Sequence, residues 1–146
     1  MLDVAVQPVI EHDNVKVTNL ARPITKEDEY RDPNNVKVVV GRNWDALYFS
    51  RSPIPYLQDL RFEEASIYHQ VCVIPFEREH LFEFVRMDET PLEQVESVDM
   101  LRLLENGYNV RLVKTDRETY PVDTPEDHEK VNAMMADDEL FKKYAG

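Results

Sequence analysis

Hydrophobic and polar positions along the chain change their periodicity repeatedly, which predicts a mixture of short strands and helices. Runs that alternate or are rich in β-branched residues, as strands are, cover residues 15–20, 36–40, 46–50, 67–74 and 110–113. The turn residues Gly41, Arg42 and Asn43 separate the second run from the third, so we expect these two runs to form a hairpin. The uninterrupted run at 67–74 is typical of a strand in the middle of a sheet.

Helical periodicity and helix-start signals predict the remaining elements. The predicted helices cover residues 2–11, 25–32, 77–86, 90–106, 124–135 and 137–144. In the third of these helices, Leu81, Phe84 and Val85 share one face. Interleaved strands and helices with an inserted hairpin indicate an α/β fold, and the length fits a single domain, residues 1–146.

The composition excludes several kinds of partner. Acidic residues outnumber basic ones by 29 to 17, and the resulting net charge of −12 repels nucleic acids and anionic membranes. No apolar run approaches the roughly 18 residues of a membrane-spanning helix. The single cysteine, Cys72, lies in an apolar run and cannot form an internal disulfide. We therefore expect it to be a small buried hydrophobe in a reducing, cytoplasmic compartment.

Glycine is scarce, since the chain contains only Gly41, Gly107 and Gly146. A loop that cradles phosphates needs several glycines close together, because its backbone N–H groups must approach the anion. If the chain handles nucleotides, we expect the part that grips the phosphates to lie elsewhere.

The segment from Tyr120 to Val131 contains the most suggestive carboxylate. Thr124 is a predicted helix cap, and Glu126 and Asp127 occupy the first turn, where acids stabilise the helix dipole. Asp123 is not explained in this way. It precedes the cap at the end of an extended segment, and strand ends that face a helix start are where open α/β sheets bind ligands. Asp123 is therefore either a structural or a functional residue.

Other polar residues also have two interpretations. His69 lies in a predicted strand, where a single histidine is more often structural than functional. Arg51 lies between two serines and beside two prolines, as either a clamp for a carboxylate or an exposed loop arginine. His12, His80 and His128 fall on predicted polar faces or helix ends, and no pair of them has the spacing of a metal site.

Four blocks of residues, taken together, resemble one family. They are NVKVV at 35–39, ALYFSRSPIP at 46–55, PLEQVES at 91–97 with Leu101 and Arg102, and VDTPED at 122–127. Their order and spacing resemble the sugar-acid cytidylyltransferases, and most of all the 3-deoxy-manno-octulosonate cytidylyltransferases (CMP-Kdo synthetases). The blocks cover the chain nearly end to end.

The resemblance implies the C-terminal half of a Rossmann-like nucleotidyltransferase fold, with an inserted β-hairpin arm that makes a homodimer. It implies a reaction of CTP with a 2-keto-3-deoxy sugar acid, Kdo or a similar one, to give a CMP-sugar and pyrophosphate for lipopolysaccharide or another surface glycan. It also implies Mg²⁺ with Asp123 as one ligand, which lowers the pKa of the attacking hydroxyl. His69 matches a histidine that contacts the sugar acid, and Arg51 belongs to the arm that shapes the sugar pocket.

Two departures from the family concern the sugar. A tyrosine that contacts the sugar falls on Val73, and a glutamate–glutamine pair falls on Asp99 and Met100, so that Asp99 keeps a carboxylate while the amide is lost. These changes leave the identity of the sugar acid open, although Kdo is the family's usual substrate.

A third departure concerns length. Family members are longer and carry, ahead of the matched region, a CTP-binding loop and a G-D-E-P block with another metal aspartate. We therefore expect this chain to be inactive alone, as a fragment, a truncated product or one half of a split enzyme that needs a complementary N-terminal half. The alternative is a non-catalytic dimerising or regulatory remnant of the fold.

Overall fold

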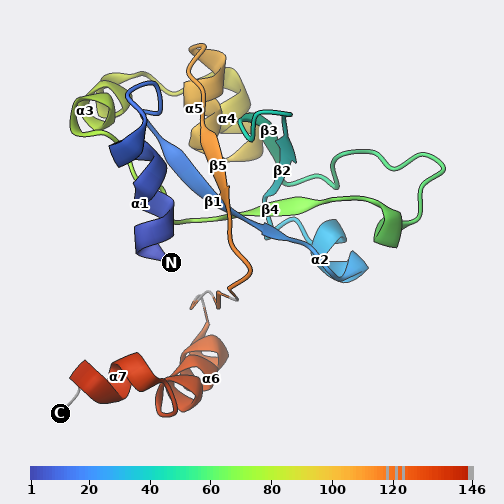
Figure 1. Ribbon diagram of the computed structural model, residues 1–146. Helices are drawn as coiled ribbons and strands as arrows, with labels where there is room; N and C mark the ends of the chain where they lie inside the picture. The colour runs from blue at the N-terminus through green and yellow to red at the C-terminus, as the bar shows by residue number, and fades with distance from the viewer. Residues whose placement is uncertain (118, 121, 123, 145–146) are drawn as a thin grey trace.

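The computed structural model describes residues 1–117, 119–120, 122 and 124–144 (Figure 1). Its strands are β1 (Thr18–Pro23), β2 (Lys37–Val40), β3 (Ala46–Ser50), β4 (Tyr68–Val71) and β5 (Arg111–Lys114). Its helices are α1 (Leu2–Glu11), α2 (Glu27–Arg31), α3 (Arg78–Arg86), α4 (Pro91–Glu96), α5 (Met100–Glu105), α6 (Pro125–Met135) and α7 (Glu139–Tyr144), with a 3₁₀ turn at Phe62–Glu64. None of these helices is long and apolar enough to cross a membrane in the part of the chain that is described.

The five strands form one sheet in the order β3-β2-β4-β1-β5. Strand β4 lies in the middle and is antiparallel to both β1 and β2, whereas β1 and β5 are parallel. Strands β2 and β3 pair as an antiparallel hairpin. The predicted α/β class, the hairpin and the central position of the strand near residue 70 are therefore confirmed. The role of the hairpin as a dimerisation arm stays a prediction.

One face of the sheet carries the main hydrophobic core. Phe49 of β3 and Leu112 of β5 are almost fully buried there, and so are Leu101 and Leu103 of α5. Figure 1 shows α5 and α4 beside β3, and α5 contacts this strand. Each side chain buried in this way contributes on the order of 1.5 to 3 kcal/mol, so this contact between helix and sheet is a large part of the stability.

Helix α1 covers part of the opposite face and lies along β1 (Figure 1). Ala5 packs with Leu20 of β1 and Val71 of β4. The hydroxyl of Thr18 donates a hydrogen bond of 2.6 Å to the carbonyl oxygen of Ala5. Thr18 and Leu20 point toward α1, because alternate strand residues share a face. Arg22, two residues farther along β1, projects from this same face.

A smaller cluster anchors the irregular segment 51–66, whose prolines predict an extended path. Tyr30 of α2 packs with Ile24 and Ile67 beneath this segment. Its hydroxyl donates a hydrogen bond of 2.7 Å to the carbonyl oxygen of Pro55. Tyr30 thus ties the segment to α2 near Pro55, whereas the neighbouring Tyr56 is 87% exposed.

Helix α3 buries a different side from the one that its apolar residues indicate. Leu81 and Val85 are exposed, whereas His80 is buried. The imidazole of His80 packs edge-to-face on Tyr108, with 4.8 Å between ring centroids, and Phe84 packs against the main core. These aromatic contacts orient the helix, so the predicted polar-face position of His80 is wrong.

The single helix predicted at 90–106 is two helices. Helix α4 ends before Ser97, whose φ of 53° is left-handed, and α5 begins at Met100. A residue in the left-handed region ends a helix, because the chain cannot continue the helical path through it. The break brings Glu93 of α4 and Arg102 of α5 together.

Glu93 and Arg102 form an ion pair that joins α4 to α5. The Nε of Arg102 donates to Oε2 of Glu93 at 2.8 Å, and a terminal guanidinium nitrogen donates to Oε1. Hydrogen bonding from Arg102 lowers the pKa of the Glu93 carboxyl. Because Glu93 is 8% exposed, loss of Arg102 leaves a buried carboxylate without its charged partner, although the N–H of Thr90 still donates to it at 3.3 Å.

We expect Arg102→Met to lower the free energy of unfolding by roughly 3 kcal/mol, because it strands the Glu93 carboxylate. Urea denaturation at pH 7 measures this change. Arg86→Met is the matched control: Arg86 is exposed on α3, and its loss is expected to cost less than about 0.5 kcal/mol. Equal effects of the two substitutions would contradict a stabilising role for the pair.

Candidate functional site

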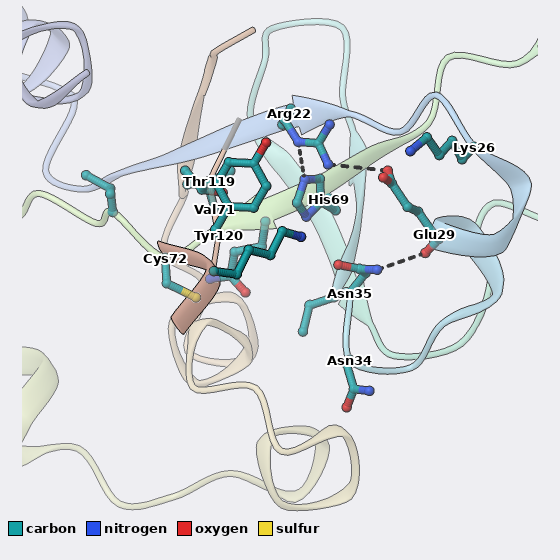
Figure 2. A pocket seen from close by; sticks show the side chains of 14 residues that line it. Arg22, Lys26, Glu29, Asn34, Asn35, His69, Val71, Cys72, Thr119 and Tyr120 are labelled. Atoms are coloured by element: carbon teal, nitrogen blue, oxygen red, sulfur yellow. Dashed lines mark hydrogen bonds and ion pairs between the residues drawn. The ribbon is translucent and has the colours of Figure 1, made fainter. Parts of the chain in front are cut away.

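A pocket of about 800 Å³ opens on the face of the sheet that α1 partly covers. Arg22 from β1 and His69 from β4 lie close together in it, with Glu29 of α2 beside Arg22 (Figure 2). Further lining residues are Lys26, Asn34, Asn35, Cys72, Thr119, Tyr120 and Lys130. The pocket is therefore assembled from segments that are far apart in the sequence.

Three basic residues stand in a row across the sheet at this pocket. His69 pairs in register with Arg22 of β1 on one side and with Lys37 of β2 on the other. Side chains of directly paired residues project from the same face of a sheet. The Nε of Arg22 donates to Nε2 of His69 at 2.9 Å, and a terminal nitrogen of Arg22 lies 3.3 Å from Oε2 of Glu29.

The imidazole of His69 is neutral at physiological pH. Burial lowers its pKa from 6.5 to about 4, and repulsion by Arg22 and Lys37 acts in the same direction against the opposing effect of Glu29. A neutral imidazole has one nitrogen that accepts a hydrogen bond and one that donates. His69 is thus suited to hold a polar ligand group by a hydrogen bond.

Lys37 connects two chain segments at one side of the site. Its side chain is fully buried, and Nζ donates to the carbonyl oxygens of Asp32 at 2.8 Å and Arg51 at 2.6 Å. Burial lowers the pKa of this ammonium group. The two hydrogen bonds tie the end of α2 to the start of the segment 51–66.

The pocket is basic although the chain is acidic. Arg22, Lys26 and Lys130 line it, and Glu29 is the only carboxylate among its described lining residues. In a chain of net charge −12, such a local excess of cations favours a small anion over other ligands. The amide of Asn35 adds a partner for hydroxyl groups, so the lining suits a hydroxylated anion.

Asp123 lies outside the described residues, and its role as a metal ligand stays a prediction. The capping chemistry beside it is confirmed: Oγ1 of Thr124 accepts from the N–H of Asp127 at 3.1 Å, and the Asp127 carboxylate accepts from the N–H of Thr124 at 3.1 Å. Glu126 lies in the first turn of the same helix, as predicted.

A magnesium site is not complete within the described residues. No group of three or more His, Cys, Asp or Glu side chains there is arranged to hold a metal ion. Nε2 of His69 accepts a hydrogen bond from Arg22, and a guanidinium next to this nitrogen opposes a cation there. The described residues therefore do not fit Mg²⁺ by themselves.

Arg51 is engaged at the root of the segment 51–66. Its guanidinium donates to the carbonyl oxygens of Pro33 at 3.1 Å, Glu96 at 2.8 Å and Ser97 at 3.1 Å, and its N–H donates to the Glu96 carboxylate at 2.9 Å. It is absent from the described lining of the pocket. The structure gives Arg51 a structural task, and contact with a substrate stays a prediction.

Asp99 acts electrostatically on Cys72, a lining residue of the pocket. Cys72 is exposed rather than buried as predicted, because β4 ends at Val71 and the chain leaves the sheet there. Desolvation by surrounding atoms, and then the Asp99 carboxylate, raise the pKa of the Cys72 thiol. Asp99 also lines a second, smaller hollow together with Glu93. Its contact with a substrate stays a prediction.

Sequence reasoning missed Arg22 and Glu29. Arg22 appears as one residue of a short strand, and Glu29 as one of several acids in the first turn of α2. Arg22 meets His69 across 47 positions, and a single sequence contains no local signal for such a contact. The sequence gives one indication of the position of Arg22: residues alternate between faces along β1, so Arg22 lies on the same face of the sheet as Leu20.

The comparisons with known proteins agree with one another. The model of a family described as cytidylyltransferase matches residues 1–118. The 3-deoxy-manno-octulosonate cytidylyltransferase of Syntrophotalea carbinolica is 39% identical over 142 residues, which covers 92% of this chain and 57% of that protein. The protein of the same description from Geobacter metallireducens is 40% identical over 141 residues, which covers 90% of this chain and 55% of that protein.

A solved structure is similar as well. The structure of CMP:2-keto-3-deoxy-manno-octonic acid synthetase complexed with CTP matches with a TM-score of 0.84 at 38% identity, over 92% of this chain and 55% of that one. The chain thus spans about half the length of the curated relatives that it matches.

We expect stability to fall at acidic pH because His69 is neutral when folded. Its folded pKa is about 4 and its unfolded pKa near 6.5. Stability is therefore full above pH 6.5 and is lost as the pH falls toward 4, because the unfolded chain binds the proton more readily. Between pH 7.5 and pH 5.0, His69 should account for a loss of roughly 1 to 2 kcal/mol.

Urea denaturation of the wild type and of His69→Gln at both pH values measures this loss. Glutamine keeps an acceptor for Arg22 but does not titrate, so the variant should lose less stability than the wild type. His12→Gln is the control, since His12 is exposed. The same pH dependence in wild type and His69→Gln would contradict the assignment.

Proposed function

Because the chain belongs to the cytidylyltransferase family, we propose that it supplies the sugar-acid side of a site that transfers CMP from CTP to 3-deoxy-manno-octulosonate or a similar 2-keto-3-deoxy sugar acid. The observation that carries this proposal is the basic pocket around Arg22 and His69. Its match in chemistry to a hydroxylated anion agrees with the relatives' descriptions.

In the proposed reaction, the anomeric oxygen of the sugar acid forms a bond to the α-phosphorus of CTP. The bond between the α-phosphorus and the bridging oxygen breaks, pyrophosphate leaves, and the sugar hydroxyl gives its proton to the surrounding water. His69 holds the sugar acid by a hydrogen bond, and Lys26 and Lys130 attract its negative charge. The protein's main contribution is to bind and orient the acceptor.

Magnesium, with Asp123 as one ligand, belongs to the proposal through the family resemblance alone. The described residues hold no group of three or more side chains arranged for a metal ion, so the proposal takes further ligands from the CTP phosphates and from residues beyond those that the structure describes. We assign no chemical step to the metal.

A complementary half with a phosphate-binding loop is part of the same proposal. The chain has three glycines and no clustered set of them, which leaves the triphosphate without a cradle. Helix α1 also keeps Leu2, Val4 and Ile10 between 50% and 74% exposed. These apolar side chains support a covering partner, and the N-terminal half of the family fold is the partner to which we commit.

A homodimer is proposed through the segment between β3 and β4. Figure 1 shows this segment extending away from the sheet, and its Tyr56 and Leu60 are 87% and 58% exposed. Exposed large apolar side chains on a projecting segment favour a protein contact. The single cysteine favours a reducing cytoplasm for the reaction, and the product would serve lipopolysaccharide or another surface glycan.

We expect the chain alone to release no pyrophosphate from CTP and 3-deoxy-manno-octulosonate. Addition of the segment of the Syntrophotalea carbinolica relative that precedes its matched region should restore release, because it supplies the missing phosphate loop. Robust release by the chain alone would refute the need for a second half. A complex that forms on size exclusion but stays inactive would favour the non-catalytic alternative.

The same active assembly tests Asp123. Asp123→Asn should lower kcat by two orders of magnitude or more, while the free energy of unfolding changes by less than about 1 kcal/mol. Asp116→Asn serves as the control, because this carboxylate is 82% exposed. A nearly unchanged kcat in Asp123→Asn would remove Asp123 from the site.

A further inference from the structure

The contact between Arg22 and His69 determines which imidazole nitrogen carries the proton. The Nε of Arg22 donates to Nε2 of His69 at 2.9 Å (Figure 2). Arginine stays protonated in proteins and has no acceptor, so Nε2 must be the accepting, unprotonated nitrogen. The proton of the neutral ring is therefore on Nδ1.

The guanidinium that makes this contact is itself held in place. A terminal nitrogen of Arg22 lies 3.3 Å from Oε2 of Glu29, and the two side chains are 17% and 27% exposed. Backbone pairing of Arg22 with His69 adds a second constraint. Arg22 is thus fixed from α2 and from the sheet, and its orientation does not depend on a ligand.

The protonated nitrogen of His69 faces the pocket. In the described part of the chain, the fully buried side-chain nitrogen and oxygen atoms without a hydrogen-bond partner are Nε2 of His80 and Oγ1 of Thr90. Nδ1 of His69 is not among them. Nor does any described residue form a hydrogen bond with Nδ1. Because His69 lines the pocket, Nδ1 is open to whatever occupies it.

We propose that Arg22 is a positioning residue that fixes His69 as a hydrogen-bond donor through Nδ1, aimed at an oxygen of the sugar acid. This inference rests on the proposed function for the identity of the ligand, but not for the tautomer. A general base would need an unprotonated nitrogen directed at the substrate. If the proton moved from Nδ1 to Nε2, the N–H of Nε2 would face the N–H of Arg22 and their hydrogen bond would be lost. His69 therefore orients the acceptor and does not take its proton.

Two of the three charged groups that face His69 favour its neutral state. Arg22 of β1 and Lys37 of β2 oppose a second proton on the ring, and Glu29 of α2 favours it but is engaged by Arg22. The neutral donor is consequently the form that a ligand meets at neutral pH.

Long-range ¹H–¹⁵N NMR of the labelled chain at pH 7 tests the proposal directly, because the two imidazole tautomers give different nitrogen shifts. We expect the Nδ1-protonated pattern for His69 in the wild type. In Arg22→Met the proton should distribute to Nε2 and the ring should titrate closer to its ordinary range. In Lys26→Met, which removes a pocket cation without a bond to His69, the tautomer should stay unchanged.

A wild-type His69 that carries its proton on Nε2 overturns the proposal, whatever the variants do. An unchanged tautomer in a folded Arg22→Met also overturns it. In an active assembly, Arg22→Met should raise KM for the sugar acid about tenfold and leave KM for CTP unchanged. The NMR result needs no substrate, so its failure is distinguishable from a failure of the proposed function.

Discussion

The antiparallel insertion of β4 between β1 and β2 determines the geometry of the site. Only in this order does His69 gain a basic neighbour on each side, Arg22 from β1 and Lys37 from β2. A slip of β4 by one residue would turn His69 to the other face of the sheet. Contacts on both faces disfavour this change of register. Val71 packs beneath α1 on the pocket side, and the amide of Gln70 donates a buried hydrogen bond of 2.7 Å on the opposite side.

Buried and half-buried polar groups hold together the segments that surround this sheet. Lys37 joins the end of α2 to the start of the segment 51–66, and the Glu96 carboxylate accepts from the hydroxyl of Ser50 at 2.6 Å and from the N–H of Arg51. Each group would be costly to bury alone, but its partners satisfy it. The root of the segment is therefore fixed while its tip, with Tyr56, stays exposed. This arrangement gives a rigid base to an arm that projects from the domain.

Local chemistry made most of the fold predictable, and long-range contacts decided the rest. The cap at Thr124 gave the start of α6, and the turn at Gly41 gave the hairpin of β2 and β3. The run at 67–74 gave the central strand, which is shorter than predicted, Tyr68–Val71. Ser97 was not foreseen as a break, because no turn residue such as glycine marks its left-handed φ of 53° in the sequence. His69 was a predicted site residue and lines the pocket, while its role toward a substrate stays a prediction. Its contact with Arg22 depends on strand order, which no local pattern encodes.

The central claim is that this chain holds the sugar acid at His69. Titration of the ¹⁵N-labelled chain with 3-deoxy-manno-octulosonate, followed by NMR, tests it without any need for CTP or a second half. The account predicts saturable shifts of the His69 ring and of the amides around Arg22 and Lys26, which are lost in His69→Gln. No shift at millimolar sugar acid, or shifts confined to residues outside the pocket, would contradict it.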